Sequence, residues 1–248
     1  MKLVNLIGIL VLASLLACRD RVAPEATVNL RVNLLLDNAP LLLNTQRYRN
    51  ANGNEYTISD FKMYLSNVKL RNRATGEVFV QPASYHLVER SASTNVYEIQ
   101  LADVPANTYT ELEFSVGVDP ARNKSTDQVG ALDPTNSMAW DWNTGYKFLL
   151  LEGRYFPATG SPRGLVYHIG GDANYRTIRL GLGEGGVSQL QAQGGQTHTL
   201  EINAEISALF KAPNLIDFGQ SSTVMFGEVA GRVADNYAQA MFTARVVR

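Results

Sequence analysis

Apolar and polar residues alternate with a period of two along much of this chain. Between Val28 and Leu34, every second residue is Val or Leu, and the residues between them are Asn or Arg. Successive side chains of an extended strand point to opposite faces, so this alternation is typical of a strand with one buried face. Further strands are predicted at residues 61–70, 77–80, 85–89, 96–101, 111–118, 147–155, 165–169, 175–182, 198–202, 222–228 and 240–247.

One short helix is predicted among these strands. It covers residues 204–211, with Asn203 as its N-cap and Pro213 beyond its end. Many short strands without helices between them predict an all-β fold, namely an antiparallel β-sandwich or barrel-like single domain with one short helix. Residues 41–54 and 119–137 lack the alternation, and both segments are long enough to be functional loops.

The N-terminal segment has the pattern of an export signal. Lys2 precedes an apolar run of about 11 residues, from Leu6 to Leu16, which is too short for a membrane span of about 20 residues. The run ends in Leu-Leu-Ala-Cys18, which resembles the bacterial lipobox, although an ordinary secretory signal with a chance cysteine is the alternative. We therefore predict a lipoprotein signal peptide at 1–17, a lipidated tether at 18–26 and one β domain at 27–248.

The predicted anchor also predicts a location. Several acyl chains on Cys18 would hold the protein stably on a membrane without a transmembrane helix. Arg19 follows the cysteine, where an aspartate would resemble an inner-membrane retention signal. We expect a lipid-anchored protein of the cell envelope, on the outer membrane and facing the periplasm or the cell surface.

Charge and cysteine content exclude several classes of function. The chain has 22 Lys and Arg against 23 Asp and Glu, with no basic stripe, so nucleic acid is not an expected partner. Cys18 is the only cysteine, and its acylation would leave no thiol for a disulfide, a zinc–thiolate site or a nucleophile. No Gly-x-Ser-x-Gly motif is present. We therefore predict that the protein is not an enzyme.

Both tryptophans of the chain lie in one segment, Met138-Ala-Trp140-Asp-Trp142. In an extended backbone, Met138, Trp140 and Trp142 would share one face. Taken alone, the segment is typical of a strand that buries two large aromatic side chains. A functional role for it follows only from the motifs around it.

Six segments together resemble the MbnP-like proteins, a family named for a copper-binding protein associated with methanobactin operons. They occur in the family's order and extend over roughly residues 27–247. These segments are Tyr-Thr-Ile-Ser-Asp-Phe-Lys-Met-Tyr-Leu-Ser-Asn-Val (56–68), Phe-Ser-Val-Gly-Val-Asp (114–119), the tryptophan segment (138–148), Glu-Gly (152–153), His-Ile-Gly-Gly (168–171), and Asp-Asn-Tyr through Met-Phe (235–242).

The resemblance implies a β protein that binds Cu(I). In related proteins a tryptophan is oxidised to kynurenine, which joins two histidines around the metal, and a diheme cytochrome c peroxidase-like partner is thought to perform the oxidation. Opening the indole ring exposes an aryl amine, whereas intact indole offers only an N–H donor and no lone pair for a metal. Carried over by position, Trp140 is the residue modified, with Trp142 as the alternative, and His168 is a ligand.

This chain departs from the family pattern at one position. Trp142 stands where the related copper site has a histidine, so one imidazole is missing. His86 or His198 would replace it only if the fold brought either to the site, and Met138, Met225 and Met241 offer thioethers that suit Cu(I).

Each of these ligand candidates also has a purely structural interpretation. The methionines would fill the core, His86 would be a surface residue of a strand, His198 would be exposed to solvent, and His168 would be a structural histidine. Two functions stay open: a copper-binding lipoprotein, or a binding or adaptor lipoprotein on a β-sandwich scaffold that holds no metal.

Overall fold

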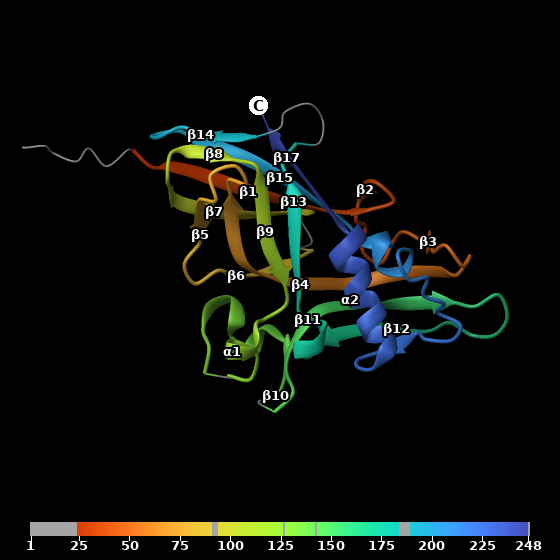
Figure 1. Ribbon diagram of the computed structural model, residues 1–248. Coiled ribbons are helices and arrows are strands. Elements are labelled where there is room, and N and C mark those ends of the chain that lie inside the picture. Colours follow the sequence, from red (N-terminus) through yellow and green to blue (C-terminus); the bar gives the residue numbers. More distant parts are fainter. Residues whose placement is uncertain (1–23, 91–93, 126, 142, 184–188, 248) are drawn as a thin grey trace, which may run out of the picture.

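The structure is a computed structural model that describes residues 24–90, 94–125, 127–141, 143–183 and 189–247. Within these ranges strands predominate and helices are few, as Figure 1 shows, so the predicted all-β fold is confirmed. Cys18 and Trp142 lie outside the described residues. The lipid anchor and the alternative modification site therefore stay predictions.

A ten-stranded sheet forms the larger layer of the molecule. Its main path runs in the order β13-β9-β4-β11-β12-β16; β3, β5 and β6 pair with β4, and β10 pairs with β11. The strand bounds are β3 Tyr48–Arg49, β4 Glu55–Arg71, β5 Val78–Val80, β6 Tyr85–Glu89, β9 Glu111–Val116, β10 Ala139–Asp141, β11 Gly145–Phe156, β12 Arg163–Gly170, β13 Arg176–Gly181 and β16 Thr223–Val224.

A five-stranded sheet forms the second layer, in the order β17-β15-β1-β2 with β7 paired to β1. Its strands are β1 Ala26–Leu36, β2 Ala39–Pro40, β7 Val96–Val104, β15 Thr197–Glu205 and β17 Phe242–Val247, and a separate pair joins β8 Asn107–Tyr109 to β14 Leu190–Ala192. Most pairs are antiparallel, but β1 runs parallel to β15 and β12 runs parallel to β16. The sandwich is therefore mixed, which local alternation alone does not reveal.

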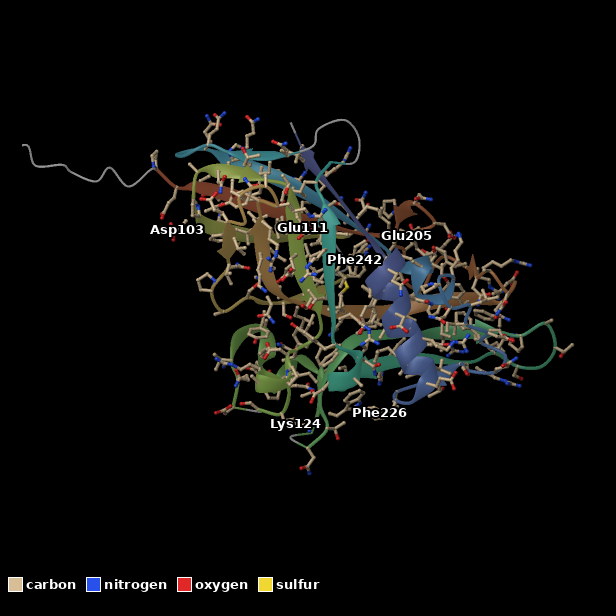
Figure 2. The ribbon with its side chains drawn as sticks, viewed as in Figure 1. Asp103, Glu111, Lys124, Glu205, Phe226 and Phe242 are labelled. Carbon is tan, nitrogen blue, oxygen red and sulfur yellow. The ribbon has the colours of Figure 1, made fainter. Side chains whose placement is uncertain are left out.

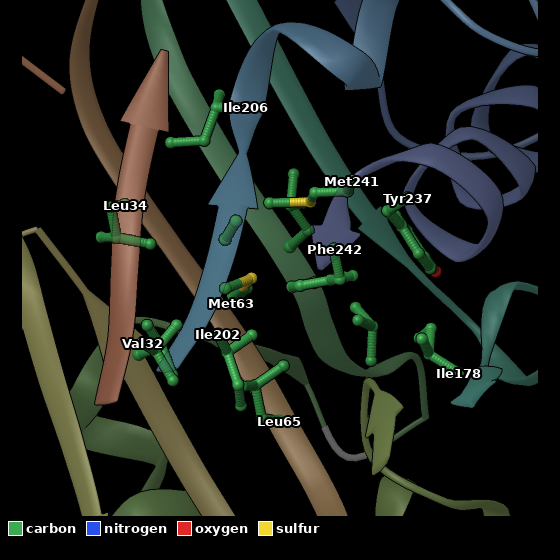
Figure 3. Close-up of a cluster of buried hydrophobic side chains, with 14 of the residues drawn as sticks. Val32, Leu34, Met63, Leu65, Ile178, Ile202, Ile206, Tyr237, Met241 and Phe242 are labelled. Atoms are coloured by element: carbon green, nitrogen blue, oxygen red, sulfur yellow. The ribbon is translucent and has the colours of Figure 1, made fainter. Parts of the chain in front are cut away.

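The main hydrophobic core lies between the two sheets. Every second residue of β1 is buried, as the sequence pattern predicts. Figure 3 shows side chains of β1 and β15 beside Met63 of β4 and Met241, which precedes β17. Both methionines are almost fully buried in this cluster. Hydrophobic burial from both layers therefore stabilises the fold.

A smaller hydrophobic cluster covers part of the opposite face of the ten-stranded sheet. It comprises Tyr64, Val118, Leu132, Met138, Tyr146, Phe148 and Leu150. The predicted loop at 119–137 contributes to it and contains α1 Pro120–Asn123, η1 Gly130–Leu132 and η2 Pro134–Asn136, the last two being 3₁₀ helices. The two faces of this sheet thus differ: the inner face meets the second sheet, and the outer face is only partly covered.

The helix predicted at residues 204–211 is present, but as a shorter 3₁₀ helix, and the longer helix near the C-terminus was not predicted. Residues up to Glu205 belong to β15, and the segment that follows is the 3₁₀ helix η4 Ile206–Phe210; η3 Asp172–Asn174 is also 3₁₀. The longer helix is α2 Glu228–Ala240, which contributes Ala230, Val233, Ala234 and Tyr237 to the main core. The strand before α2 is β16, which has only two residues, so the strand predicted at 222–228 was too long.

Neither α-helix within the described ranges has the length and apolar character needed to cross a membrane.

Candidate metal centre

Trp140 lies on the outer face of the ten-stranded sheet, against β12. It belongs to β10, which pairs with the start of β11. A Cβ atom added to Gly170 would lie 2.6 Å from Cζ3 of Trp140 and 2.4 Å from the carbonyl oxygen of Tyr146. Since real side chains do not tolerate such distances, only glycine at position 170 lets the indole ring approach the backbone of β12 this closely.

His168 shares this face of β12 with Gly170. The two residues are separated by one residue, so their Cβ directions coincide and their positions lie roughly 7 Å apart along the strand. The intervening Ile169 is fully buried in the main core, which confirms the alternation. Trp140, which packs on Gly170, and His168 therefore lie on the same face of the sheet.

The imidazole of His168 is held by a carboxylate. Its Nε2 lies 2.8 Å from Oε1 of Glu152, and the side chains are 12% and 43% exposed respectively. An ionised carboxylate only accepts hydrogen bonds, so Nε2 carries a hydrogen, and in the neutral form of the ring Nδ1 keeps the lone pair. A carboxylate behind one imidazole nitrogen is the usual arrangement that orients a metal-binding histidine.

Residues after β16 complete the surroundings of Trp140. The ring of Phe226 is tilted against the indole, with 4.9 Å between the ring centroids. Phe226 is 54% exposed and its neighbour Met225 is 40% exposed, so both are large apolar residues at the surface. Figure 2 labels Phe226 near one end of α2, at the lower edge of the molecule.

Charged residues of both signs lie near His168 on the neighbouring strands. Glu152 of β11 is opposite Asp60 of β4, and Lys62 lies 3.6 Å from Glu89. Burial raises the pKa of the Asp60 carboxyl, an effect that Lys62 partly offsets. Burial also lowers the pKa of Lys147, which donates a hydrogen bond to the carbonyl oxygen of Ser137 at 2.9 Å.

His86 does not join this site, which corrects the expectation that it supplies a ligand. It pairs with Leu65 and is followed two residues later by Val88; both of these belong to the main core, so His86 faces the inner side of the sheet, opposite to His168. Its Nε2 lies 3.0 Å from Oε1 of Gln81. His86 is half-buried, and burial lowers the pKa of its ring to about 4.

His198 and Met241 lie away from Trp140 and His168, and Met138 is buried. His198 lies on β15 in the five-stranded sheet, where its Nε2 accepts a hydrogen bond from the backbone N–H of Gln193 at 3.1 Å. Met138 is fully buried in the smaller cluster and Met241 is 1% exposed in the main core. These two methionines fill the core, which agrees with their structural interpretation.

The candidate site is a surface cluster and not an enclosed cavity. Among the described residues, no three His, Cys, Asp or Glu side chains are grouped to hold a metal ion. A cavity of about 570 Å³ lies away from the site and is lined by Arg47, Phe156 and ten other residues, none of them from the site. Within the described part of the chain, a metal with three or more protein ligands at Trp140 and His168 would therefore need at least one donor other than His, Cys, Asp or Glu.

Sequence reasoning missed the contributions of Gly170 and Phe226. Two glycines follow His168 in the chain and indicated a close approach by another group, but not that the group is the indole of Trp140. The pattern around Phe226 indicated only a strand. The parallel pairing of β16 with β12 joins segments about 57 positions apart, as Val166 with Thr223 shows, and no local pattern encodes that pairing.

Comparisons with known proteins agree with this architecture. Residues 25–226 match the family model described as MbnP. Among solved structures, MbnP from Methylosinus trichosporium is similar to this chain, with a TM-score of 0.59 over 90% of this chain and 99% of that chain, at 15% sequence identity. This similarity shows a shared fold. No curated protein sequence matches the chain significantly.

Proposed function

As the chain belongs to the MbnP family, we propose that it is a lipoprotein of the cell envelope that binds Cu(I) at Trp140 and His168, with Trp140 oxidised to kynurenine. The observation that carries this proposal is the contact between the indole and Gly170. Because of that contact, Trp140 lies on the same face of β12 as His168, over a position two residues further along the strand.

The donor set of this site fits Cu(I). An aryl amine from an opened indole and Nδ1 of His168 are neutral nitrogen donors, and imidazole is a common copper ligand. Glu152 orients the ring through Nε2 and leaves Nδ1 available. We propose that copper bound here is held for storage or delivery.

The modification requires an oxidant, for which the resemblance implies a diheme peroxidase-like partner. Two molecules of hydrogen peroxide would open the pyrrole ring of Trp140, yielding N-formylkynurenine and two waters. Hydrolysis would then release the formyl carbon as formic acid. Trp140 is only partly buried beside the exposed Phe226, so an electron-transfer partner can approach it.

Mass spectrometry of the protein produced with this partner tests the modification. We expect the tryptic peptide that contains Trp140 to gain one oxygen and lose one carbon, and the change to be absent from Trp140→Phe but present in Trp142→Phe. An unchanged peptide from the wild-type protein would exclude kynurenine at this site.

Competition with a chromophoric Cu(I) chelator tests the role of His168. Loss of an outer partner of a metal ligand typically costs roughly 10- to 100-fold in affinity, and loss of the ligand itself in His168→Ala should cost at least as much. His198→Ala is the matched control, because His198 lies in the other sheet. Equal affinities of the two variants would remove His168 from the site.

Labelling with a radioactive fatty acid tests the anchor. We expect incorporation into the full chain and recovery in the membrane fraction, and neither for Cys18→Ser. Membrane recovery of the unlabelled variant would show that another feature holds the protein there.

A second candidate function is favoured by the exposure of Met225 and Phe226. Apolar side chains at the surface beside Trp140 form a surface that a partner protein could cover. An adaptor lipoprotein of this kind would bind its partner without metal. Wild-type protein with no Cu(I) affinity above that of His168→Ala would favour this function.

A further inference from the structure

We infer that Met225 supplies a thioether ligand to the Cu(I) held by Trp140 and His168. This inference rests on the proposed function and identifies the donor that takes the place of the missing imidazole. It follows from three observations: the exposure of Met225, its position next to His168, and the contact between its neighbour Phe226 and Trp140.

Exposure distinguishes Met225 from the other methionines named as candidate ligands. Met138 and Met241 are 0% and 1% exposed and pack in hydrophobic clusters, whereas Met225 is 40% exposed and belongs to neither cluster. A large apolar side chain that stays partly in water forgoes part of the free energy of burial. A core-filling role therefore does not account for a methionine at this position.

The strand register places Met225 beside His168. In the parallel pair, Val166 is opposite Thr223 and Tyr167 is opposite Val224, so the next positions along the two chains are His168 and Met225. Tyr167 and Val224 are both buried in the main core. His168 therefore faces the outer side of the sheet, where Trp140 lies. Met225, the first residue after β16, lies in a bend between Val224 and the Phe226 that contacts Trp140.

The contact between Phe226 and Trp140 fixes the segment after β16 to the site. The ring centroids are 4.9 Å apart, so the chain stays next to the indole beyond the last paired residue of β16. Gly227 follows with a φ of 83°, a conformation that favours glycine, and the chain then enters α2 at Glu228. Met225 is thus held between a paired strand on one side and a ring contact on the other.

Thioether chemistry suits the proposed metal. A thioether sulfur is a soft, neutral donor that selects Cu(I), and it needs no deprotonation to bind. Together with the imidazole Nδ1 and an aryl amine, it gives three neutral donors without a thiolate. Such a site would favour Cu(I) and Ag(I) over Zn²⁺, and oxidation of Met225 to the sulfoxide would remove one of its donors.

X-ray absorption at the copper edge tests this inference directly on the wild-type protein loaded with Cu(I). We expect a sulfur scatterer in the first coordination shell of the wild type and none in Met225→Leu. A first shell of nitrogen and oxygen alone in the wild type would overturn the inference without any variant. Since Cys18 is the only cysteine, the Cys18→Ser background excludes its sulfur as the source.

Affinity measurements separate this inference from the proposed function. We expect Met225→Leu to weaken Cu(I) binding roughly tenfold or more and Met241→Leu, a matched exchange in the core, to leave it unchanged. If His168→Ala lowers the affinity but Met225→Leu equals Met241→Leu, Met225 is not a ligand and the proposed function stands. If the wild type itself binds no better than His168→Ala, the proposed function fails.

Discussion

The two faces of the ten-stranded sheet each carry a histidine and a methionine, with opposite consequences. On the inner face, Met63 is fully buried and burial lowers the pKa of His86 to about 4. On the outer face at β12, His168 is bonded to a carboxylate and Met225 is at the surface. The comparison teaches that residue type alone does not make a metal ligand. A candidate ligand must also lie on a face where packing leaves its donor atoms accessible.

Truncation of the two methionines should show the largest difference between the faces. We expect Met63→Ala to lower the free energy of unfolding by about 2–5 kcal/mol, because it leaves a cavity in the core. Met225→Ala should change it by less than about 0.5 kcal/mol, as is usual at the surface. Urea unfolding followed by circular dichroism measures both. Similar losses for the two variants would contradict the difference in burial.

Two glycines of β12 allow a test of the contact with the indole. We expect Gly170→Ala to cost about 1–3 kcal/mol, because the added methyl group would overlap Trp140 and the Tyr146 carbonyl. Gly164→Ala is the control on the same strand, since its nearest neighbour lies 3.8 Å away. In a Trp142→Phe background, the emission maximum of Trp140 should shift only in Gly170→Ala. Equal stability of the two variants would mean that the indole is not seated on β12.

The depressed pKa of His86 predicts a pH dependence specific to the inner face. The imidazole of His86 takes up a proton near pH 6.5 in the unfolded chain, but only near pH 4 in the folded protein. The free energy of unfolding therefore falls as the pH drops below about 6.5, and the loss is complete near pH 4. Between pH 7 and pH 5 we expect this group to cost about 1–2 kcal/mol. Chemical denaturation of His86→Gln at both pH values should show that much less loss, and an unchanged loss would refute the assignment.

The smallest effect on stability is expected at Glu152. Its side chain is 43% exposed, so Glu152→Gln should change the free energy of unfolding by less than about 0.5 kcal/mol. The same substitution should lower the fraction of His168 that carries its hydrogen on Nε2. A carboxylate can only accept a hydrogen bond from the ring, whereas an amide can also donate one. Nitrogen-15 spectra of the imidazole report this ratio. An unchanged ratio would show that Glu152 does not set the tautomer.

Strand prediction succeeded where burial follows the local pattern. β6 occupies the predicted residues 85–89, and the alternation of β1 is matched by its burial residue for residue. It failed at α2, where the preceding residues alternate like a strand and the apolar face consists largely of alanines. The buried Ala230, Val233, Ala234 and Tyr237 are spaced three to four apart, which was the available signal.

The sequence by itself determined most of the longer strands, the all-β class and the family, because these depend on local alternation and on the order of motifs. Only the tertiary structure decided which donors meet. The face on which His86 and His168 lie depends on strand register, which one residue of slip would reverse. The position of Trp140 on the same face as His168 depends on the packing of the indole on Gly170, and the approach of residues 225 and 226 to this face depends on the parallel pairing of β16 with β12. These contacts join distant segments, so they arise only when the whole sheet is assembled.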